Sequence, residues 1–192
     1  MANYFISDLH FGHKSVLSFD NRPFTNIEEH DQTLINNWNA TVGMDDDVYV
    51  LGDISWYNAT KTIDIFNQLN GSVHLIKGNH DGRLLRNREL QQRFCEITDY
   101  KELSLPEKKG IVLSHYPIPC FKNHYHGWYH FYGHVHNSYE WNMMEHLKKE
   151  MEELYSTPCN MFNVGAMMPY IDYTPRSLEF ILESNHGTKS EI

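Results

Sequence analysis

The chain contains the stretch Val73-His74-Leu75-Ile76-Lys77-Gly78-Asn79-His80-Asp81. In this stretch a short apolar segment with strand character is followed by a glycine and three polar residues. The same order, an apolar segment followed at once by residues that can bind a metal, occurs at four other places. Those segments end in Ser7-Asp8-Leu9-His10, in Gly52-Asp53, in His115 and in Gly133-His134-Val135-His136. Open α/β sheets bind ligands at the carboxyl ends of their strands. We therefore expect five segments that are distant in sequence to converge on one site.

Short apolar runs alternate with helical patterns along the chain, which favours an α/β layered domain. The expected strands are Asn3–Ser7, Asp47–Leu51, Ser72–Ile76, Gly110–Ser114, Trp128–Tyr132, Asn160–Val164 and Ser177–Leu182. The expected helices are Ile27–Asn39, Thr60–Leu69, Arg83–Phe94 and Trp141–Tyr155. Thr25 and Glu28 are expected to form a capping box at the start of the first helix. Because no linker or internal repeat is visible, residues 1–192 are expected to form a single domain.

The 192-residue chain is acidic, with a net charge of −9. A protein that binds DNA through its phosphates usually has a basic surface, so tight binding of duplex DNA is not expected. The expected partner is a small phosphorylated substrate, such as a nucleotide, at a locally positive metal site. No apolar run approaches the roughly 18 residues of a membrane span, and no secretory signal is visible. Three widely separated cysteines suit a reducing compartment, so a cytoplasmic location is expected.

The candidate metal ligands comprise two carboxylates, one amide oxygen and four imidazoles. They are Asp8, His10, Asp53, Asn79, His115, His134 and His136. Two divalent cations held by this set keep a residual positive charge, because only the two carboxylates offset it. Such a charge suits a phosphate ester. The mixture of nitrogen and oxygen ligands favours Mn, Fe, Zn or Co over Ca or Mg.

The spacing of these ligands suggests how their side chains meet. Asp8 and His10 are two apart, so they share one face if the strand continues regularly, and the same holds for His134 and His136. A glycine stands directly before several ligands, and a residue without a side chain lets the backbone turn tightly or approach another segment closely.

Five motifs along the chain resemble the signature of the calcineurin-like metallophosphoesterase family. In order, they are Asp-x-His, Gly-Asp, Gly-Asn-His-Asp, a later histidine and Gly-His-x-His. The resemblance covers Asp8 to His136, which is about two-thirds of the chain. Phe162-Asn163-Val164-Gly165 is similar to the strand that follows the last motif in small bacterial and phage members. The resemblance implies a β-sandwich flanked by helices on both outer faces.

The resemblance also implies a role for each residue. One metal takes Asp8, His10, Asp53 and His136. The other takes Asp53, Asn79, His115 and His134, so that Asp53 bridges the two. The family reaction is hydrolysis of a phosphomono- or phosphodiester, in which a metal-bridging hydroxide attacks phosphorus directly. His80 then acts as the acid for the leaving group, and Asp81 orients His80.

Alternatives remain open for the function and for several residues. The same fold can serve as a noncatalytic protein-interaction scaffold, and an enzyme with this site can also be a nuclease. His13 and Arg22 are candidate contacts to the substrate phosphate, although His13 can equally support a ligand or start a helix. His30 is expected at the surface. The Met/Leu stripe of Trp141–Tyr155 is expected to pack on the domain or on a second copy in a homodimer.

Overall fold

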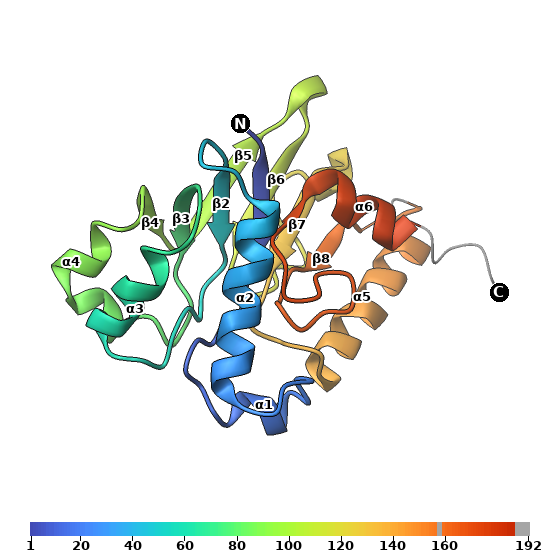
Figure 1. Cartoon of the computed structure of the whole chain (residues 1–192). Helices are drawn as coiled ribbons and strands as arrows, with labels where there is room; N and C mark the ends of the chain where they lie inside the picture. The colour runs from blue at the N-terminus through green and yellow to red at the C-terminus, as the bar shows by residue number, and fades with distance from the viewer. Residues whose placement is uncertain (157–158, 187–192) are drawn as a thin grey trace.

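Two sheets pack face to face in the computed structural model, which describes residues 1–156 and 159–186 (Figure 1). The first sheet contains β1 (Asn3–Ile6), β2 (Asp47–Val50), β3 (Ser72–Ile76), β4 (Glu96–Thr98) and β9 (Arg176–Ser177). The second contains β5 (Tyr100–Ser104), β6 (Gly110–Ser114), β7 (Tyr129–Tyr132) and β8 (Met161–Asn163). The spatial orders are β4-β3-β2-β1-β9 and β5-β6-β7-β8. The edge strands β9 and β5 are antiparallel to their neighbours, and the other pairs are parallel.

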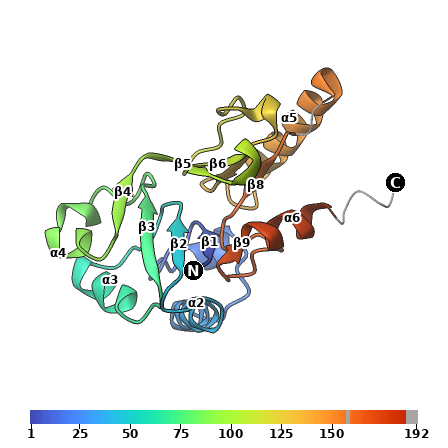
Figure 2. The same cartoon turned by 90° about the horizontal axis from the view of Figure 1, so that it is seen from above.

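Helices cover the outer face of each sheet. The described helices are α1 (Val16–Phe19), α2 (Ile27–Thr41), α3 (Ala59–Phe66), α4 (Arg88–Gln91), α5 (Tyr139–Tyr155) and α6 (Leu178–His186), with short 3₁₀ helices η1 (Leu84–Arg86), η2 (Pro106–Lys108) and η3 (His124–His126). Figure 2 shows α2 and α3 on one side of the first sheet, the second sheet on its other side, and α5 beyond that. The expected sandwich between helical layers is therefore confirmed. Within the described residues, no helix has the length and apolar character needed to span a bilayer.

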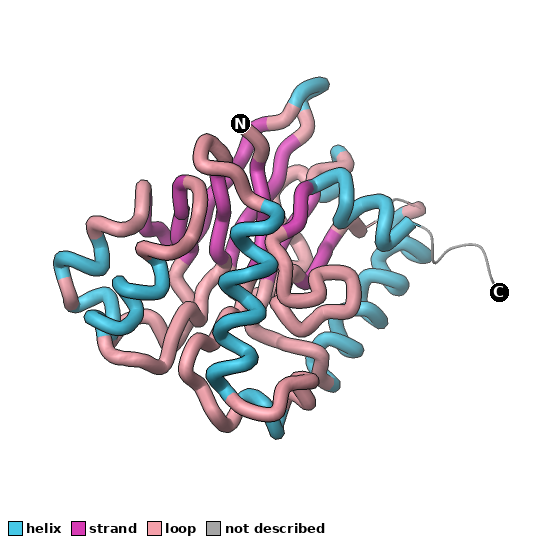
Figure 3. Tube along the Cα trace, in the orientation of Figure 1, coloured by secondary structure: helices cyan, strands magenta, loops and turns pink. Residues whose placement is uncertain are grey.

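The space between the sheets is filled by aromatic and aliphatic side chains. Phe5 of β1 meets Phe131 of β7 edge to face, with ring centroids 4.8 Å apart. On the outer face of the first sheet, Trp38 of α2 is buried and donates its indole N–H to the carbonyl oxygen of Asn70 at 2.9 Å. Burial of a large apolar side chain contributes about 1.5–3 kcal/mol. The loops at the strand ends, drawn in pink in Figure 3, are thus connected to a packed core.

Helix α5 begins at Tyr139, two residues before the expected start, because Ser138 caps it by accepting a hydrogen bond from the Glu140 N–H at 3.1 Å. Met151 is buried with side chains of the second sheet, so this part of the expected stripe packs on the domain. Leu154 is 68% exposed, which shows that the stripe is only partly covered by its own chain.

The expected strand Ser177–Leu182 is wrong. Pairing with β1 ends at Ser177, and the chain turns into α6. Ile181 is fully buried whereas Phe180 is 39% exposed. The partly buried Leu178 and Leu182 lie three residues before and one residue after Ile181, which is a helical face and not a strand face. The short strands β4 and β5 were not expected at all.

Two helix boundaries also differ from expectation. Asn26, and not Thr25, caps α2 by accepting from the Glu29 N–H at 2.8 Å. The Glu29 carboxylate in turn accepts from the Thr25 N–H at 2.8 Å. The expected helix Arg83–Phe94 is divided at Asn87, whose side chain caps α4 by accepting a hydrogen bond from the Leu90 N–H at 2.9 Å. Local side-chain caps therefore set both starts.

Candidate metal centre

The loops that follow the central strands carry the candidate ligands in left-handed backbone conformations. The φ angles are 54° at Asp8, 52° at His10, 53° at Asp53, 68° at His134 and 50° at His136. Such residues cost about 1–3 kcal/mol each and cluster at functional sites. Because β1 ends at Ile6, Asp8 and His10 do not share a strand face. The expected alternation is wrong, and the left-handed turns bring the side chains together instead.

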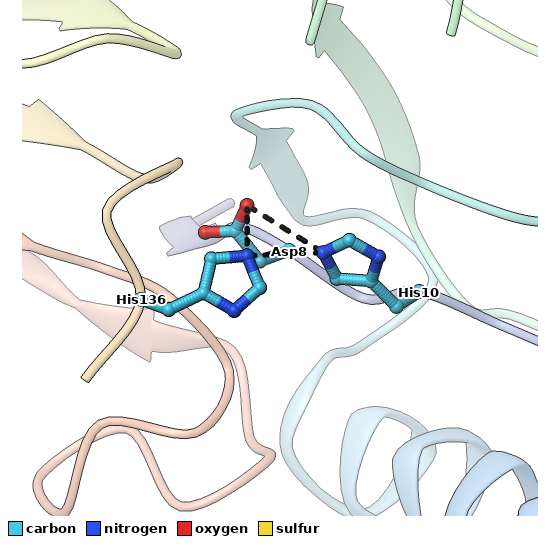
Figure 4. Close-up of side chains that lie close together, drawn as sticks. All are labelled: Asp8, His10 and His136. Carbon is cyan, nitrogen blue, oxygen red and sulfur yellow. Dashed lines mark hydrogen bonds and ion pairs between the residues drawn. The ribbon is translucent and has the colours of Figure 1, made fainter. Parts of the chain in front are cut away.

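Asp8, His10 and His136 form the first group of possible ligands (Figure 4). The Nε2 atoms of His10 and His136 are 3.2 Å apart. They lie 4.0 and 3.8 Å from Oδ1 of Asp8. Two nitrogens bound to one metal at about 2.1 Å, with angles of roughly 90–109°, lie roughly 3.0–3.4 Å apart. The separation of the two imidazole nitrogens fits ligation of one ion.

The second group gathers around Asn79. Its amide oxygen lies 2.9 Å from Nε2 of His115 and 3.0 Å from Nδ1 of His134. Nε2 of His115 is also 3.7 Å from Oδ2 of Asp53. The nearest ligand atoms of Asp8, Asp53 and His115 all lie within 4.8 Å of one another. The two groups are therefore adjacent, and Asp8 lies within reach of both.

Asp53 lies between the groups, since its Oδ2 is also 4.0 Å from Nε2 of His10. Burial and the charge of Asp8 raise the pKa of Asp53 to about 6, against the lowering effect of His115. Burial, followed by the charge of Arg22, holds the pKa of His10 well below its ordinary value. Without a metal, the surroundings thus disfavour the ionised form of Asp53 and the protonated form of His10. Divalent cations bound by ionised carboxylates and neutral imidazoles fit both conditions.

Hydrogen bonds from the backbone hold these side chains in place. Nδ1 of His115 lies 2.7 Å from the carbonyl oxygen of Leu51 and donates to it, which leaves Nε2 as the nitrogen free to bind a metal. The backbone N–H of His134 donates to both carboxylate oxygens of Asp8, at 3.2 and 3.0 Å. The site is therefore oriented by groups that need no metal.

Residues 3–163, which include every candidate ligand, match the family model of the calcineurin-like phosphoesterases. The chain belongs to this family. The family comprises metal-dependent phosphoesterases, which typically bind two metal ions, and the buried Asp/His groups of this member could hold them.

Relatives of this family member are similar over much of its length. The chain is 31% identical over 184 residues to an uncharacterized protein of Methanocaldococcus jannaschii, covering 94% of this chain and 89% of that one. It is 42% identical over 134 residues to the Gene 66 protein of Mycobacterium phage L5, covering 61% and 64%. The crystal structure of a protein of unknown function from Aquifex aeolicus is 23% identical, with a TM-score of 0.61 and coverage of 95% and 98%. This last similarity confirms the fold.

The glycines before the ligands allow the close approach that the sequence suggests. A Cβ atom on Gly133 would collide with the Ser7 side chain and the Asp8 carboxylate. A Cβ atom on Gly78 would collide with the backbone and carboxylate of Asp53. A side chain at either position would therefore occupy the space of a carboxylate group of the centre.

Gly133→Ala is expected to lower the metal content of the protein and to destabilise it by about 1–3 kcal/mol, because the new methyl group overpacks the Asp8 carboxylate. Gly82→Ala is the matched control, since a Cβ there meets nothing within 4 Å. Denaturant unfolding and elemental analysis of both variants measure the difference. Equal stability and equal metal content in the two would contradict the steric role of Gly133.

Asp81 holds the backbone of two loops, and its expected role in orienting His80 stays a prediction. Its carboxylate is buried and accepts hydrogen bonds from three backbone N–H groups, at Gly78 (2.8 Å), Ile54 (2.9 Å) and Asp53 (3.0 Å). Burial raises the pKa of Asp81, although these donors act in the opposite direction. The residue ties the loop after β2 to the loop after β3, so it positions Asp53 through the backbone.

Asp81→Asn is expected to destabilise the protein by about 1.5–3 kcal/mol, because backbone N–H groups donate to both carboxylate oxygens and the amide NH2 that replaces one oxygen cannot accept a hydrogen bond. That loss corresponds to a fall in Tm of roughly 3–12 °C. Asp64→Asn, at an exposed position on α3, is the control and should change Tm little. Thermal unfolding of both variants tests this, and equal Tm values would show that the three bonds contribute nothing.

Arg22 contacts the loop that carries Asp8. Its side chain is buried and donates to the carbonyl oxygens of Asp8 at 2.9 Å and Leu9 at 3.3 Å. Its Nε pairs with Oδ2 of Asp20 at 2.9 Å. A guanidinium used in this way holds the loop that carries Asp8. A contact between Arg22 and a substrate phosphate stays a prediction.

Sequence reasoning missed Asp20 and misplaced His30. His30 is buried, not at the surface, and its Nε2 lies 2.8 Å from Nη1 of Arg22. Oδ2 of Asp20 lies 3.2 Å from Nδ1 of His136. Burial lowers the pKa of His136, but the carboxylates of Asp20 and Asp8 outweigh it and raise the pKa. Neither Asp20 nor His30 belongs to a motif, so no sequence signal marked either residue.

His13 contacts His10, which fits one of the three roles left open for it, the support of a ligand. Nδ1 of His13 lies 3.3 Å from Nδ1 of His10, on the side opposite the ligand nitrogen. The His13 ring stacks on Trp56, with centroids 3.9 Å apart and planes 1° from parallel. Trp56 also touches the rings of His10 and His80. A contact between His13 and substrate stays a prediction, and Trp56 was not anticipated.

Proposed function

We propose that the protein is a two-metal phosphoesterase that hydrolyses a phosphomono- or phosphodiester by direct attack of water on phosphorus. The observation that carries this proposal is that Oδ2 of Asp53 lies near a ligand of each group, 4.0 Å from Nε2 of His10 and 3.7 Å from Nε2 of His115. One metal is assigned to Asp8, His10, Asp53 and His136. The other is assigned to Asp53, Asn79, His115 and His134. When bound, two such ions offset the charge of the phosphate oxygens and lower the pKa of the attacking water.

Mn, Fe, Zn or Co are the proposed ions, because imidazole nitrogen dominates the ligand set. The protein's own part is to fix the ligands before substrate arrives. The hydrogen bond from His115 to the Leu51 carbonyl selects the imidazole tautomer. The backbone N–H of His134 holds the Asp8 carboxylate. These contacts support a centre that needs little rearrangement to bind a phosphate.

His80 is proposed as the acid that protonates the departing oxygen. Its side chain is 51% exposed, and Nε2 lies 4.0 Å from Oδ2 of Asp53. It therefore stands at the edge of the ligand groups, with an open side toward solvent. Its backbone N–H donates to Oδ1 of Asp53 at 3.0 Å, and its ring contacts Trp56 with centroids 4.6 Å apart. Both contacts support a fixed position for a proton donor.

A metal-screened hydrolysis assay tests the proposed function. Bis(p-nitrophenyl) phosphate, p-nitrophenyl phosphate and short oligonucleotides distinguish a phosphodiesterase, a phosphomonoesterase and a nuclease. We expect hydrolysis that requires a transition metal and is abolished by a chelator. A protein that carries two ions per chain yet hydrolyses none of these substrates would instead be the noncatalytic scaffold.

A further inference from the structure

A cavity of about 440 Å³ opens beside His80. It lies between the loop after β2 and the loop after β3, and Trp56, Tyr57, Asn79 and His80 line it together with Arg83 and Arg86. The volume is in the range of small-molecule sites. Because Asn79 and His80 belong to the metal centre as well, the cavity is continuous with it.

Arg83 and Arg86 reach this cavity from one short helix. Arg83 caps η1 and Arg86 ends it, so the two are three residues apart. Residues three apart in a 3₁₀ helix lie on the same face. Both side chains are exposed, and neither forms an ion pair within residues 1–156 and 159–186. Two guanidinium groups are therefore available to a ligand at the same wall.

The charge of the cavity is opposite to that of the chain. The protein has a net charge of −9, yet the cavity lining contains two arginines and no Asp or Glu. A guanidinium matches phosphate with two parallel N–H donors. The partly exposed Trp56 ring and Tyr57 offer flat apolar surface for a sugar or a base. The combination fits a phosphorylated organic group and not a neutral one.

We propose that this cavity binds the leaving group, and that Arg83 and Arg86 select a leaving group that carries a phosphate of its own. This inference rests on the proposed function, because it places the scissile ester between the metal centre and His80. The substrate class is then a nucleotide-like diester with an additional terminal phosphate. Binding of that phosphate at the arginines holds the departing oxygen beside His80.

Three dinucleotides test the preference. TpT has no terminal phosphate, pTpT carries one at its 5′ end, and TpTp carries one at its 3′ end. One of the two phosphorylated dinucleotides therefore has a phosphorylated leaving group, whichever P–O bond of the diester is cleaved. We expect the wild type to show a kcat/KM at least about tenfold higher for one phosphorylated dinucleotide than for TpT, the effect of a charge-assisted hydrogen bond. In Arg83→Gln/Arg86→Gln the ratio should fall to near one. Arg88→Gln/Arg93→Gln removes the same charge from exposed positions on and after α4 and should keep the wild-type ratio.

A ratio near one in the wild type, or an unchanged ratio in Arg83→Gln/Arg86→Gln, would overturn the inference. Hydrolysis of bis(p-nitrophenyl) phosphate but of no dinucleotide would also overturn it, while the proposed function would stand. If the wild type hydrolyses nothing, the proposed function fails, and calorimetry with thymidine 3′,5′-bisphosphate decides the inference separately. Binding to the metal-loaded wild type should be at least about tenfold tighter than to Arg83→Gln/Arg86→Gln, and equal binding would refute the role of the arginines.

Discussion

Asp53→Asn is expected to reduce the metal content from two ions per chain to one or fewer and to lower hydrolysis by roughly 10³-fold or more. Oδ2 of Asp53 lies 4.0 Å from the Nε2 atom of His10 in one group and 3.7 Å from the Nε2 atom of His115 in the other. The amide keeps the shape of the side chain but loses its charge and one oxygen ligand. Elemental analysis and the hydrolysis assay measure the two effects.

A folding control separates this result from simple destabilisation. Burial and the Asp8 charge disfavour the ionised form of Asp53, so the metal-free Asp53→Asn protein should melt no lower than the metal-free wild type. Asp64→Asn, which removes an exposed carboxylate on α3, should keep full metal content and activity. Retention of both ions by a folded Asp53→Asn protein would show that Asp53 does not bridge them.

His80→Ala is expected to slow hydrolysis of an alkyl or nucleoside ester by roughly 10²–10⁴-fold and to leave the metal content at the wild-type level. An alkoxide leaves poorly without a proton, whereas p-nitrophenolate hardly requires one. The same variant should therefore slow a p-nitrophenyl ester far less. The half-exposed position of His80, 4.0 Å from the edge of the Asp53 carboxylate, is the geometric basis of this expectation.

The comparison needs both classes of ester and a metal analysis on each variant. His146→Ala, at an exposed position on α5, controls for loss of an imidazole and should behave as the wild type with both esters. If His80→Ala loses metal, or slows both esters by the same factor, His80 is a structural residue or a ground-state phosphate contact. Asp81→Asn should differ from His80→Ala, because its three backbone bonds make any slowing equal for the two esters.

The sequence predicted the position of the site because each candidate ligand directly follows a strand. That relation survives although several strand boundaries were misplaced, since the loops and not the strand residues carry the ligands. The backbone within those loops could not be predicted. Asp8 and His10 meet through left-handed turns at φ of 54° and 52°, and residue spacing alone contains no information about such turns.

The residues behind the ligands were the least predictable part of the site. Arg22 and Asp20 lie in a loop without motif character, and only the folded chain brings Arg22 to the Asp8 carbonyl at 2.9 Å and Asp20 to His136 at 3.2 Å. A buried guanidinium and a surface guanidinium have the same local sequence pattern. The same limit applies to α6, because the spacing of its apolar residues is compatible with a strand and with a helix. Only the burial of Ile181 in the folded chain distinguishes the two.

The central claim is that one chain holds two metal ions on either side of Asp53. Anomalous diffraction from crystals of the manganese-loaded protein tests it most directly, since it locates each ion independently of activity. We expect two peaks about 3.5–4 Å apart, one among Asp8, His10 and His136 and the other among Asn79, His115 and His134, with Asp53 contacting both. A single peak, or peaks that do not share Asp53, would contradict the account.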